Sequence, residues 1–395
     1  MNIPQGYKQT ELGIIPEDWE VTTIKQIADI TTGNKNTQDA EEGGKYPFYV
    51  RSQNVERINS YSYDCEGIVT AGDGVGTGKI FHYVREKFGL HQRAYLIYNF
   101  KDFDSQYFYW YFSQYFYDRI NQMTAKSSVD SVRKEMIEDM CILRAPIAEQ
   151  RAIAEALSDV DGLIAALDKK IAKKRLIKQG AMQQLLTGKK RLPGFTDKWG
   201  KMCFKSIYKF ASEGGTPDTK NESFYANGNI PFVKIEDTEQ KYIYSGKSFI
   251  TQEGVNHSSA WLIPANSIIF TNGATIGNVA INKIPVTTKQ GILGIILNSR
   301  VELEFVYYLL SSSTFQDEVN MRLSKGTFAT IILKHLDEIP INIHVSLKEQ
   351  QAIATILSDM DKEIADLEAQ RDKYRLLKSG MMQKLLTGQI RLKTE

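Results

Sequence analysis

The sequence predicts an α+β protein in which one unit occurs twice, each unit being a mixed α/β domain followed by a long helix. Three observations predict this fold class. The segments 149–192 and 349–392 are identical at more than half of their positions without a gap. Both carry apolar residues at alternating spacings of four and three, the pattern of helices that pair in a coiled coil. Before each copy, short apolar runs alternate with Gly and Asn turns and one amphipathic helix, which is typical of a mixed α/β domain.

The repeat divides the chain of 395 residues into four regions. We expect domains at 1–145 and 191–345 and helices at 146–190 and 346–390. The best partner for one apolar seam is the other copy of that seam, so we predict two antiparallel helices that form a coiled coil and separate the two domains, related by a pseudo-two-fold repeat. The alternative is that each helix packs on its own domain. The second domain carries about 20 extra residues, most of them before Ile268.

Both long segments favour helix in composition. They are rich in Ala, Glu, Lys, Leu and Gln and contain no proline. Gly188 or Gly388 is a natural stop after each helix, and Arg371 interrupts the second seam. The residues that we expect to pair the helices are Ile153, Leu157, Val160, Ile164, Leu167, Ile171, Ile353, Leu357, Met360, Ile364 and Leu367.

Corresponding elements are expected inside the two domains. Strands are predicted at 46–51 and 230–235, at 67–70 and 266–270, and at 291–297. Amphipathic helices are predicted at 103–120 and 303–319. Short strands at 141–143 and 341–343 then lead into the long helices.

The composition excludes several protein classes. The net charge is +2, and the three cysteines, Cys65, Cys141 and Cys203, are far apart. This spacing fits neither a disulfide framework nor a zinc site and favours a reducing, cytoplasmic compartment. The N-terminus lacks the pattern of a signal peptide, and no apolar run reaches the roughly 18 residues of a membrane span.

No motif in the sequence supports catalysis by this chain, and no metal site is expected. The glycine-rich segment 72–79 fails the phosphate-loop pattern because Asp73 replaces its first glycine and Ile80 follows the lysine. A strained turn that lets backbone approach a ligand is the better interpretation. Asp218, Glu239 and Lys241 imitate a nuclease metal site, so a Mg²⁺-dependent DNA endonuclease is the alternative function.

The repeated pieces resemble the specificity (S) subunit of Type I restriction-modification systems. The resemblance covers the whole chain. It rests on Pro146-Ile-Ala-Glu-Gln and Leu347-Lys-Glu-Gln-Gln at the helix starts, and on Gln184-Leu-Leu-Thr-Gly and Lys384-Leu-Leu-Thr-Gly at their ends. The openings Gly13-Ile-Ile-Pro-Glu-Asp-Trp and Leu192-Pro-Gly-Phe-Thr-Asp-Lys-Trp also match. Ser346 departs from the family, which usually has proline there.

The resemblance implies a non-catalytic chain without a cofactor of its own. Each domain would be a target recognition domain that reads one half of a bipartite, asymmetric site in double-stranded DNA. The helices would set the spacing and dock two modification (methyltransferase) subunits, which bring S-adenosylmethionine. Restriction (motor-nuclease) subunits that use ATP and Mg²⁺ would join them. A coiled-coil scaffold without a DNA role is a third possibility.

Loops at matching positions in the two domains supply the candidate DNA contacts, because base reading needs side chains at groove edges. Gln92 recurs as Gln290, and Lys126 recurs as Lys325. In the first domain the candidates are Asn34, Lys35, Arg51, Gln53, His91, Gln92, Arg93 and Lys126. In the second they are Lys220, Asn221, Lys234, Asn272, Lys289, Gln290 and Lys325.

Overall fold

The structure is a computed structural model that describes residues 3–123, 131–273, 275–323 and 330–392. The chain divides into two compact units. The first comprises Met1–Asp168 with Ala369–Glu395, and the second comprises Lys169–Glu368. Each unit therefore holds one domain, part of the first long helix and part of the second.

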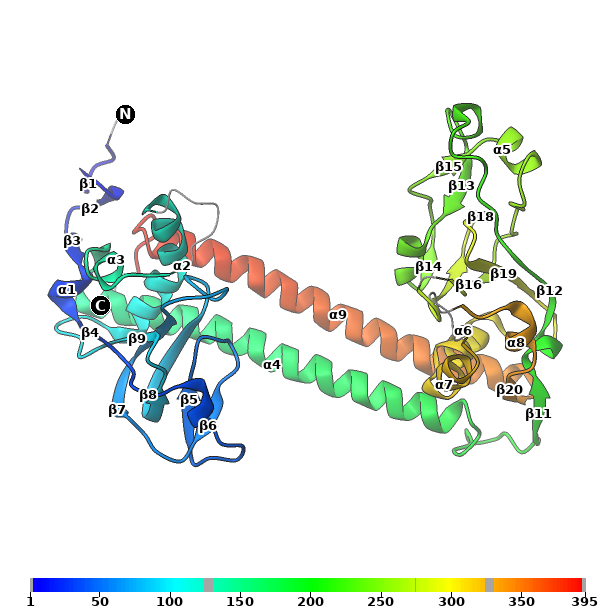
Figure 1. The fold of residues 1–395 in the computed structure, drawn as a ribbon, viewed down its shortest axis with the longest axis horizontal. Coiled ribbons are helices and arrows are strands. Elements are labelled where there is room, and N and C mark those ends of the chain that lie inside the picture. Colours follow the sequence, from blue (N-terminus) through cyan, green and yellow to red (C-terminus); the bar gives the residue numbers. More distant parts are fainter. Residues whose placement is uncertain (1–2, 124–130, 274, 324–329, 393–395) are drawn as a thin grey trace. The chain divides into compact units, whose positions relative to one another are not determined.

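The first domain is built on a six-stranded sheet that α2 (Ser105–Met123) covers (Figure 1). All neighbouring strands are antiparallel except β5 and β8, which are parallel. The sheet order is β4 (Asp29–Thr32), β9 (Ala94–Tyr98), β7 (Tyr63–Ala71), β8 (Phe81–Leu90), β5 (Tyr46–Tyr49) and β6 (Glu56–Ile58). The aromatic side chains of α2, such as Phe108 and Phe112, are fully buried in the core between helix and sheet.

Smaller elements complete this domain. β1 (Tyr7–Thr10) and β2 (Gly13–Pro16) form a hairpin, and β3 (Glu20–Thr23) pairs with β10 (Cys141–Arg144) just before the long helix. The remaining helices are α1 (Ile24–Ile27), η1 (Thr37–Asp39) and α3 (Lys134–Glu138).

The second domain repeats this plan with insertions. Its main sheet has the order β12 (Tyr208–Glu213), β19 (Ile292–Leu297), β16 (Ser267–Thr271), β17 (Val279–Asn282) and β14 (Tyr242–Ile243). A smaller sheet has the order β15 (Phe249–Ile250), β13 (Ile230–Val233) and β18 (Thr287–Thr288), and β11 (Trp199–Cys203) pairs with β20 (Pro340–His344). The helices are η2 (Phe204–Ile207), η3 (Glu222–Phe224), η4 (Ile235–Glu239), α5 (Gln252–Asn256), α6 (Leu303–Ser311), α7 (Ser313–Met321) and α8 (Leu333–Asp337).

The two domains share one topology. The order β4-β9-β7-β8 corresponds to β12-β19-β16-β17. The parallel pairing of β5 with β8 recurs as β13 with β18, so the long β8 corresponds to β17 and β18 together. Most of the extra length of the second domain lies between β13 and β16, where β14, β15 and α5 occur. This placement before Ile268 is as predicted.

The predicted helix 303–319 is wrong in one respect, because it is two helices. α6 ends at Ser311 and α7 begins at Ser313. Ser312 between them has extended backbone, and its hydroxyl accepts the N–H of Phe315 while donating to the carbonyl of Leu309. A serine that caps the second helix in this way favours a break over a continuous helix.

The two long helices are α4 (Ile147–Leu185) and α9 (Leu347–Leu385), each of 39 residues. They start at equivalent positions despite Ser346, whose carbonyl accepts the N–H of Gln350 as the Pro146 carbonyl accepts that of Gln150. Both stop before a glycine with φ of +70°, Gly188 or Gly388, which is the predicted left-handed C-terminal turn. The helices end a few residues earlier than the predicted bounds at 190 and 390.

Within each unit the segments of α4 and α9 run antiparallel, which confirms the predicted fold class. In the first unit Asp161 pairs with Lys378, and Asp168 pairs with Arg371 and Arg375. Arg371, which interrupts the apolar seam of α9, therefore contacts α4 through an ion pair with Asp168.

The second unit repeats this arrangement, since Lys174 pairs with Glu363 and Lys178 with Asp361. Residues later in α4 pair with residues earlier in α9, which is the order of two antiparallel helices.

The predicted seam residues divide between two environments. Nine of the eleven are buried, and Leu167 and Met360 are half-buried. Ile153 and Leu157 belong to the core of the first domain, together with Leu385 and Leu386. Ile353, Leu357, Leu185 and Leu186 take the same places in the second. The first turns of each helix thus pack on a domain, as the alternative proposed, and the later turns pair with the other helix.

Candidate nucleic-acid interface

In the first domain, backbone hydrogen bonds join the loops after β5, β7 and β8, and the segment before α3, at one edge of the sheet. The N–H of His91 donates to the carbonyl of Tyr49 at 3.0 Å, so the turn after β8 lies against the end of β5. The N–H of Gly72 donates to the carbonyl of Arg93 at 2.9 Å, and the N–H of Val132 donates to the carbonyl of Gly72 at 2.7 Å. Side chains from these loops must therefore emerge close together.

The second domain repeats the same three hydrogen bonds. The backbone N–H of Lys289 donates to the carbonyl of Val233 at 3.0 Å. The backbone N–H of Asn272 donates to the carbonyl of Gly291 at 2.9 Å, and that of Ile331 to the carbonyl of Asn272 at 3.2 Å. These bonds align the two domains residue by residue at this edge and make Gln290 the counterpart of Gln92. The two edges are the same backbone frame with different side chains.

The structure brings together most of the predicted contacts of the first domain. Arg51, His91, Gln92 and Arg93 line one hollow of about 450 Å³, together with residues 36–38. Lys35 lies beside it, because its backbone forms a parallel bridge with His91. Two others lie apart: Asn34 accepts a hydrogen bond from Ser62, and Gln53 lines a different hollow, beside His82 and Trp110. Lys126 falls outside the described residues.

His91 has a supporting position rather than an exposed one. Its side chain is buried, and its Nδ1 accepts the backbone N–H of Arg93 at 3.0 Å. Burial, with the nearby Arg51 charge, lowers the pKa of His91 below its ordinary value of about 6.5. A neutral imidazole fits its role as an acceptor that fixes the turn carrying Gln92 and Arg93.

Two residues at this edge were missed from the sequence. Asp73, in the glycine-rich loop after β7, accepts a hydrogen bond of 2.7 Å from an Nη1 of each of Arg51 and Arg93. Asn36 accepts a hydrogen bond from the amide of Gln92. The glycines around Asp73 were the available signal, since they indicated a turn that approaches a ligand, but its arginine partners are distant in sequence.

The predicted contacts of the second domain are more dispersed. Lys289 and Gln290 are exposed in the turn after β18, and the half-buried Lys234 lies between β13 and η4, at the N-cap position of η4. Lys220 and Asn221 lie in the exposed loop before η3, which Asn221 caps through the N–H of Ser223. Lys325 falls outside the described residues.

Asn272 differs from the expected displayed side chain. Only 6% of it is exposed, and its Nδ2 donates to the carbonyl of Ile331 at 3.2 Å. The amide holds two loops together inside the edge. Asn272 occupies the position of Gly72 in the repeat. The matching backbone hydrogen bonds show this equivalence, although the two residue types differ.

Lys241 and Asp218 of the alternative nuclease site bind other partners, and Glu239 is the last residue of η4. The ammonium of Lys241 pairs with Glu304 at 2.7 Å and donates to Tyr308 and Ser358. Asp218 accepts the backbone N–H of Lys220. Across the described ranges, no group of three or more His, Cys, Asp and Glu side chains could hold a metal ion.

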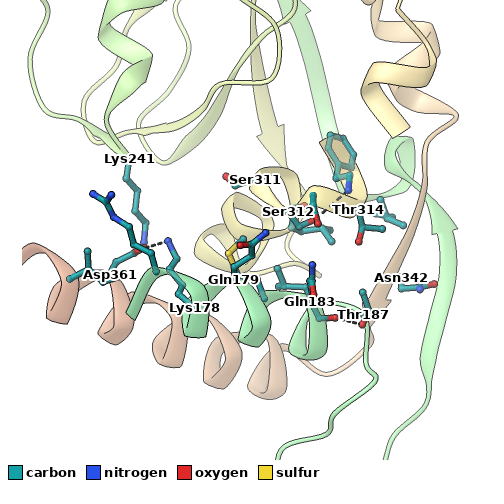
Figure 2. A pocket seen from close by; sticks show the side chains of 18 of the residues that line it. Lys178, Gln179, Gln183, Thr187, Lys241, Ser311, Ser312, Thr314, Asn342 and Asp361 are labelled. Atoms are coloured by element: carbon teal, nitrogen blue, oxygen red, sulfur yellow. Dashed lines mark hydrogen bonds and ion pairs between the residues drawn. The ribbon is translucent and has the colours of Figure 1, made fainter. Parts of the chain in front are cut away.

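A large cavity lies in the second unit, beside α4, α9 and the break between α6 and α7 (Figure 2). Its volume is about 1070 Å³, and its lining includes the amides of Gln179 and Gln183 and the hydroxyl groups of Ser311–Thr314. Figure 2 shows the charged side chains gathered at one end, where Lys178 pairs with Asp361. Such a wall can form hydrogen bonds but offers no nucleophile paired with a base.

Two related domains that display different polar side chains on one repeated frame define a duplicated recognition protein. Comparison with known proteins gives the family. Residues 16–174 and 196–374 each match the Type I restriction modification DNA specificity domain. Because these matches cover most of the chain, the protein belongs to this family.

Relatives and solved structures agree with this assignment. The chain is 26% identical over 432 residues to the type I restriction enzyme MjaVIII specificity subunit of Methanocaldococcus jannaschii, covering 98% of this chain and 97% of that protein. The fold matches the S subunit of a Type I restriction-modification system from M. genitalium with a TM-score of 0.64 and 15% identity, over 100% of this chain and 99% of that one. A chain from a structure of type I R-M complex assembly matches with a TM-score of 0.57 and 11% identity, over 95% and 99%.

The protein is accordingly a non-catalytic DNA specificity subunit. Nothing in the fold or in the comparisons supports the alternative nuclease through Asp218, Glu239 and Lys241. All three cysteines are free, as expected. No helix in the described part of the chain is long and apolar enough to cross a membrane.

Proposed function

We propose that each domain reads its own half of a bipartite, asymmetric DNA site through the edge formed by the loops after β5, β7 and β8, or after β13, β16 and β18. The observation that carries this proposal is the repeated set of three backbone hydrogen bonds at that edge. A common frame places both edges alike, whereas base specificity comes from side chains that reach groove edges. Since those side chains differ, the two half-sites should differ.

The long helices supply two equivalent docking points for partner subunits. Leu176 is 68% exposed and Ile177 is 47% exposed on α4, and their counterparts on α9, Leu376 and Leu377, are 77% and 50% exposed. Neighbouring apolar side chains exposed among charged ones are typical of protein interaction sites. Their occurrence once in each repeat supports two modification (methyltransferase) subunits per chain.

The partners would supply the chemistry. This chain would bind no cofactor. The modification subunits would bring S-adenosylmethionine, and the restriction subunits would bring ATP and Mg²⁺. The setting would be the cytoplasm, where the three free cysteines would stay reduced.

Two matched substitutions test the division of labour. The chain, assembled with its modification subunits, would methylate a duplex library in which every position of the site is randomised. Gln92→Ala should change the preference at positions of one half-site only, and Gln290→Ala at positions of the other only. If either substitution changes both halves, or if both lower methylation of all sequences equally, the edges do not read separate half-sites.

A further inference from the structure

We propose that Asp73 is a positioning residue that orients Arg51 and Arg93 to read guanine in the half-site of the first domain. The proposal rests on the proposed function of this edge. It adds the residue that organises the reading and the base that is read.

The three side chains form a compact ion triad. The Asp73 carboxylate binds Arg51 through Oδ1 and Arg93 through Oδ2, both at 2.7 Å. The Asp73 side chain is 17% exposed, whereas those of Arg51 and Arg93 are 39% and 63% exposed. The carboxylate is therefore set behind two guanidinium groups that face solvent.

Each arginine uses a single nitrogen in this triad. Among the described residues, Nη1 is the one atom through which either guanidinium makes a hydrogen bond. A guanidinium has five N–H groups in a fixed plane, so two parallel donors remain on each. Two parallel N–H groups match the O6 and N7 acceptors of guanine in the major groove.

The support beneath Asp73 is rigid. The turn after it is closed by Thr77, whose N–H and hydroxyl donate to the carbonyl of Gly74 at 3.0 and 2.6 Å. On its other side Gly72 is bonded to two segments, through Arg93 and Val132. Burial raises the pKa of Asp73, but the hydrogen bonds from its two arginines outweigh it and leave the pKa below the usual value. The carboxylate is thus charged at neutral pH and holds both arginines.

The charge of the triad favours base reading over phosphate binding. Affinity for phosphates grows with the number of positive charges that a protein brings. Asp73 cancels one of the two charges of Arg51 and Arg93, so it weakens attraction to the DNA backbone. Asp73 instead fixes the orientation of the two arginine side chains. This reduces the conformational entropy that these long side chains lose when they bind.

The second domain provides an internal comparison. The shared hydrogen bonds place Ile235, Gly273 and Gly291 where the first domain has Arg51, Asp73 and Arg93. A Cβ on Gly273 would lie 3.0 Å from the Cα of Gly291, and Gly291 has a φ of +87°. Neither position accommodates a side chain easily, so the triad is confined to the first half of the repeat.

The test is the site preference of Asp73→Asn, measured on the complex with its modification subunits and the randomised duplex library. Asparagine keeps the shape but loses the charge that holds two guanidinium groups. We expect discrimination for guanine at one or two positions of one half-site to fall about tenfold or more, with the other half-site unchanged. Arg51→Lys and Arg93→Lys should lower discrimination at the same positions, since lysine lacks the fork of two donors. Asp73→Glu should restore part of it.

Asp139→Asn is the matched control, because it removes a 2.6 Å ion pair with Lys25 in the same domain and should leave every preference intact. A uniform change in the methylation of all sequences by Asp73→Asn, with a steeper salt slope, would show that the freed arginines contact phosphates and would overturn the proposal. So would unchanged preferences. If Gln92→Ala still alters one half-site while Asp73→Asn alters none, the proposed function stands and this inference alone fails.

Discussion

Arg391→Ala should loosen the first unit and leave the second intact. Arg391 lies in the C-terminal segment and binds the first domain. Its guanidinium donates to Glu149 at 2.7 and 2.8 Å and to Asp18 at 2.7 and 2.9 Å. Glu149 also accepts the indole N–H of Trp19 and the backbone N–H of Leu392. The guanidinium of Arg391 therefore links the segment after α9 to Asp18 and Glu149 of the first unit.

The magnitude follows from burial. The Glu149 side chain is 5% exposed, so removing Arg391 leaves a carboxylate without its cation inside the domain. Breaking a buried pair costs about 3–5 kcal/mol. Arg391 is 28% exposed, which lets water reach the vacated place and sets the cost near the lower end, at about 3 kcal/mol. The Asp18 contact adds less than about 1 kcal/mol, because that side chain is 52% exposed.

Hydrogen exchange measured by mass spectrometry is the suitable assay, since a chain of two units lacks a single unfolding midpoint. A loss of about 3 kcal/mol should speed exchange roughly 100-fold for core amides of β7 and α2 that exchange through opening of the unit. Amides of β16 and β19 should keep their rates. Arg191→Ala, which removes the equivalent contact with Glu349, should give the reverse pattern.

A double substitution separates the charge from the packing. Glu149→Gln together with Arg391→Met removes both charges and should recover much of the lost protection, because replacing both members of a buried pair is far less costly than removing one. Unchanged exchange in β7 and α2 of Arg391→Ala, or equal acceleration in both units, would refute the reasoning.

Three further predictions follow from the same contacts. Leu176→Asp and Leu376→Asp should each remove one modification subunit, so that each single variant assembles with one and the double variant with none; analytical ultracentrifugation would show it, and full assembly of the double variant would exclude these docking points. The hydrogen bond from Arg391 lowers the pKa of Asp18, so this contact stabilises the first unit above the unfolded pKa of about 3.9 and is lost as pH falls through the lower folded value; Asp18→Asn should flatten the acid dependence of exchange below about pH 5, and an unaltered profile would contradict it. The purified chain with Mg²⁺ should leave duplex DNA uncut, and cutting that Lys241→Ala abolishes would reinstate the nuclease alternative.

The long helices and their pairing were predictable because their signal is local and strong. The seam from Ile153 to Ile171 indicated a packed helix, and its second copy indicated the partner helix, although the first seam residues, Ile153 and Leu157, pack in the core of the first domain. Strands β5, β7, β13, β16 and β19 were predictable from apolar runs next to glycine turns, whereas β8, β9 and β17 of the two main sheets were not predicted. The break at Ser312 was not, because one capping hydroxyl decides it against a continuous apolar pattern. Where Leu385 and Leu386 pack was open too, since their partners are at the other end of the chain.

The candidate interface was predictable in outline only. Loops of matching position indicated the edge of the first domain where Arg51, His91, Gln92 and Arg93 line one hollow, and Gln92 and Gln290 occupy equivalent places in the two domains. Asp73 was not among the predicted residues, because its two arginine partners are distant in sequence and follow other strands. Asn272 has the polar type expected of a DNA contact, but the fold uses its amide to join two loops. The residue type shows which side chains could contact DNA. The tertiary contacts decide which of those side chains are free of partners inside the protein.

The most direct test of the central claim is an exchange of one domain. Residues 1–145 would be replaced by the first domain of another specificity subunit while Asp18 and Trp19, which contact Arg391 and Glu149, are kept. Sequencing the methylated sites in cells that carry the modification subunits should show one new half-site beside one unchanged half-site. A change in both halves, or in neither, would contradict the assignment of one half-site to each domain.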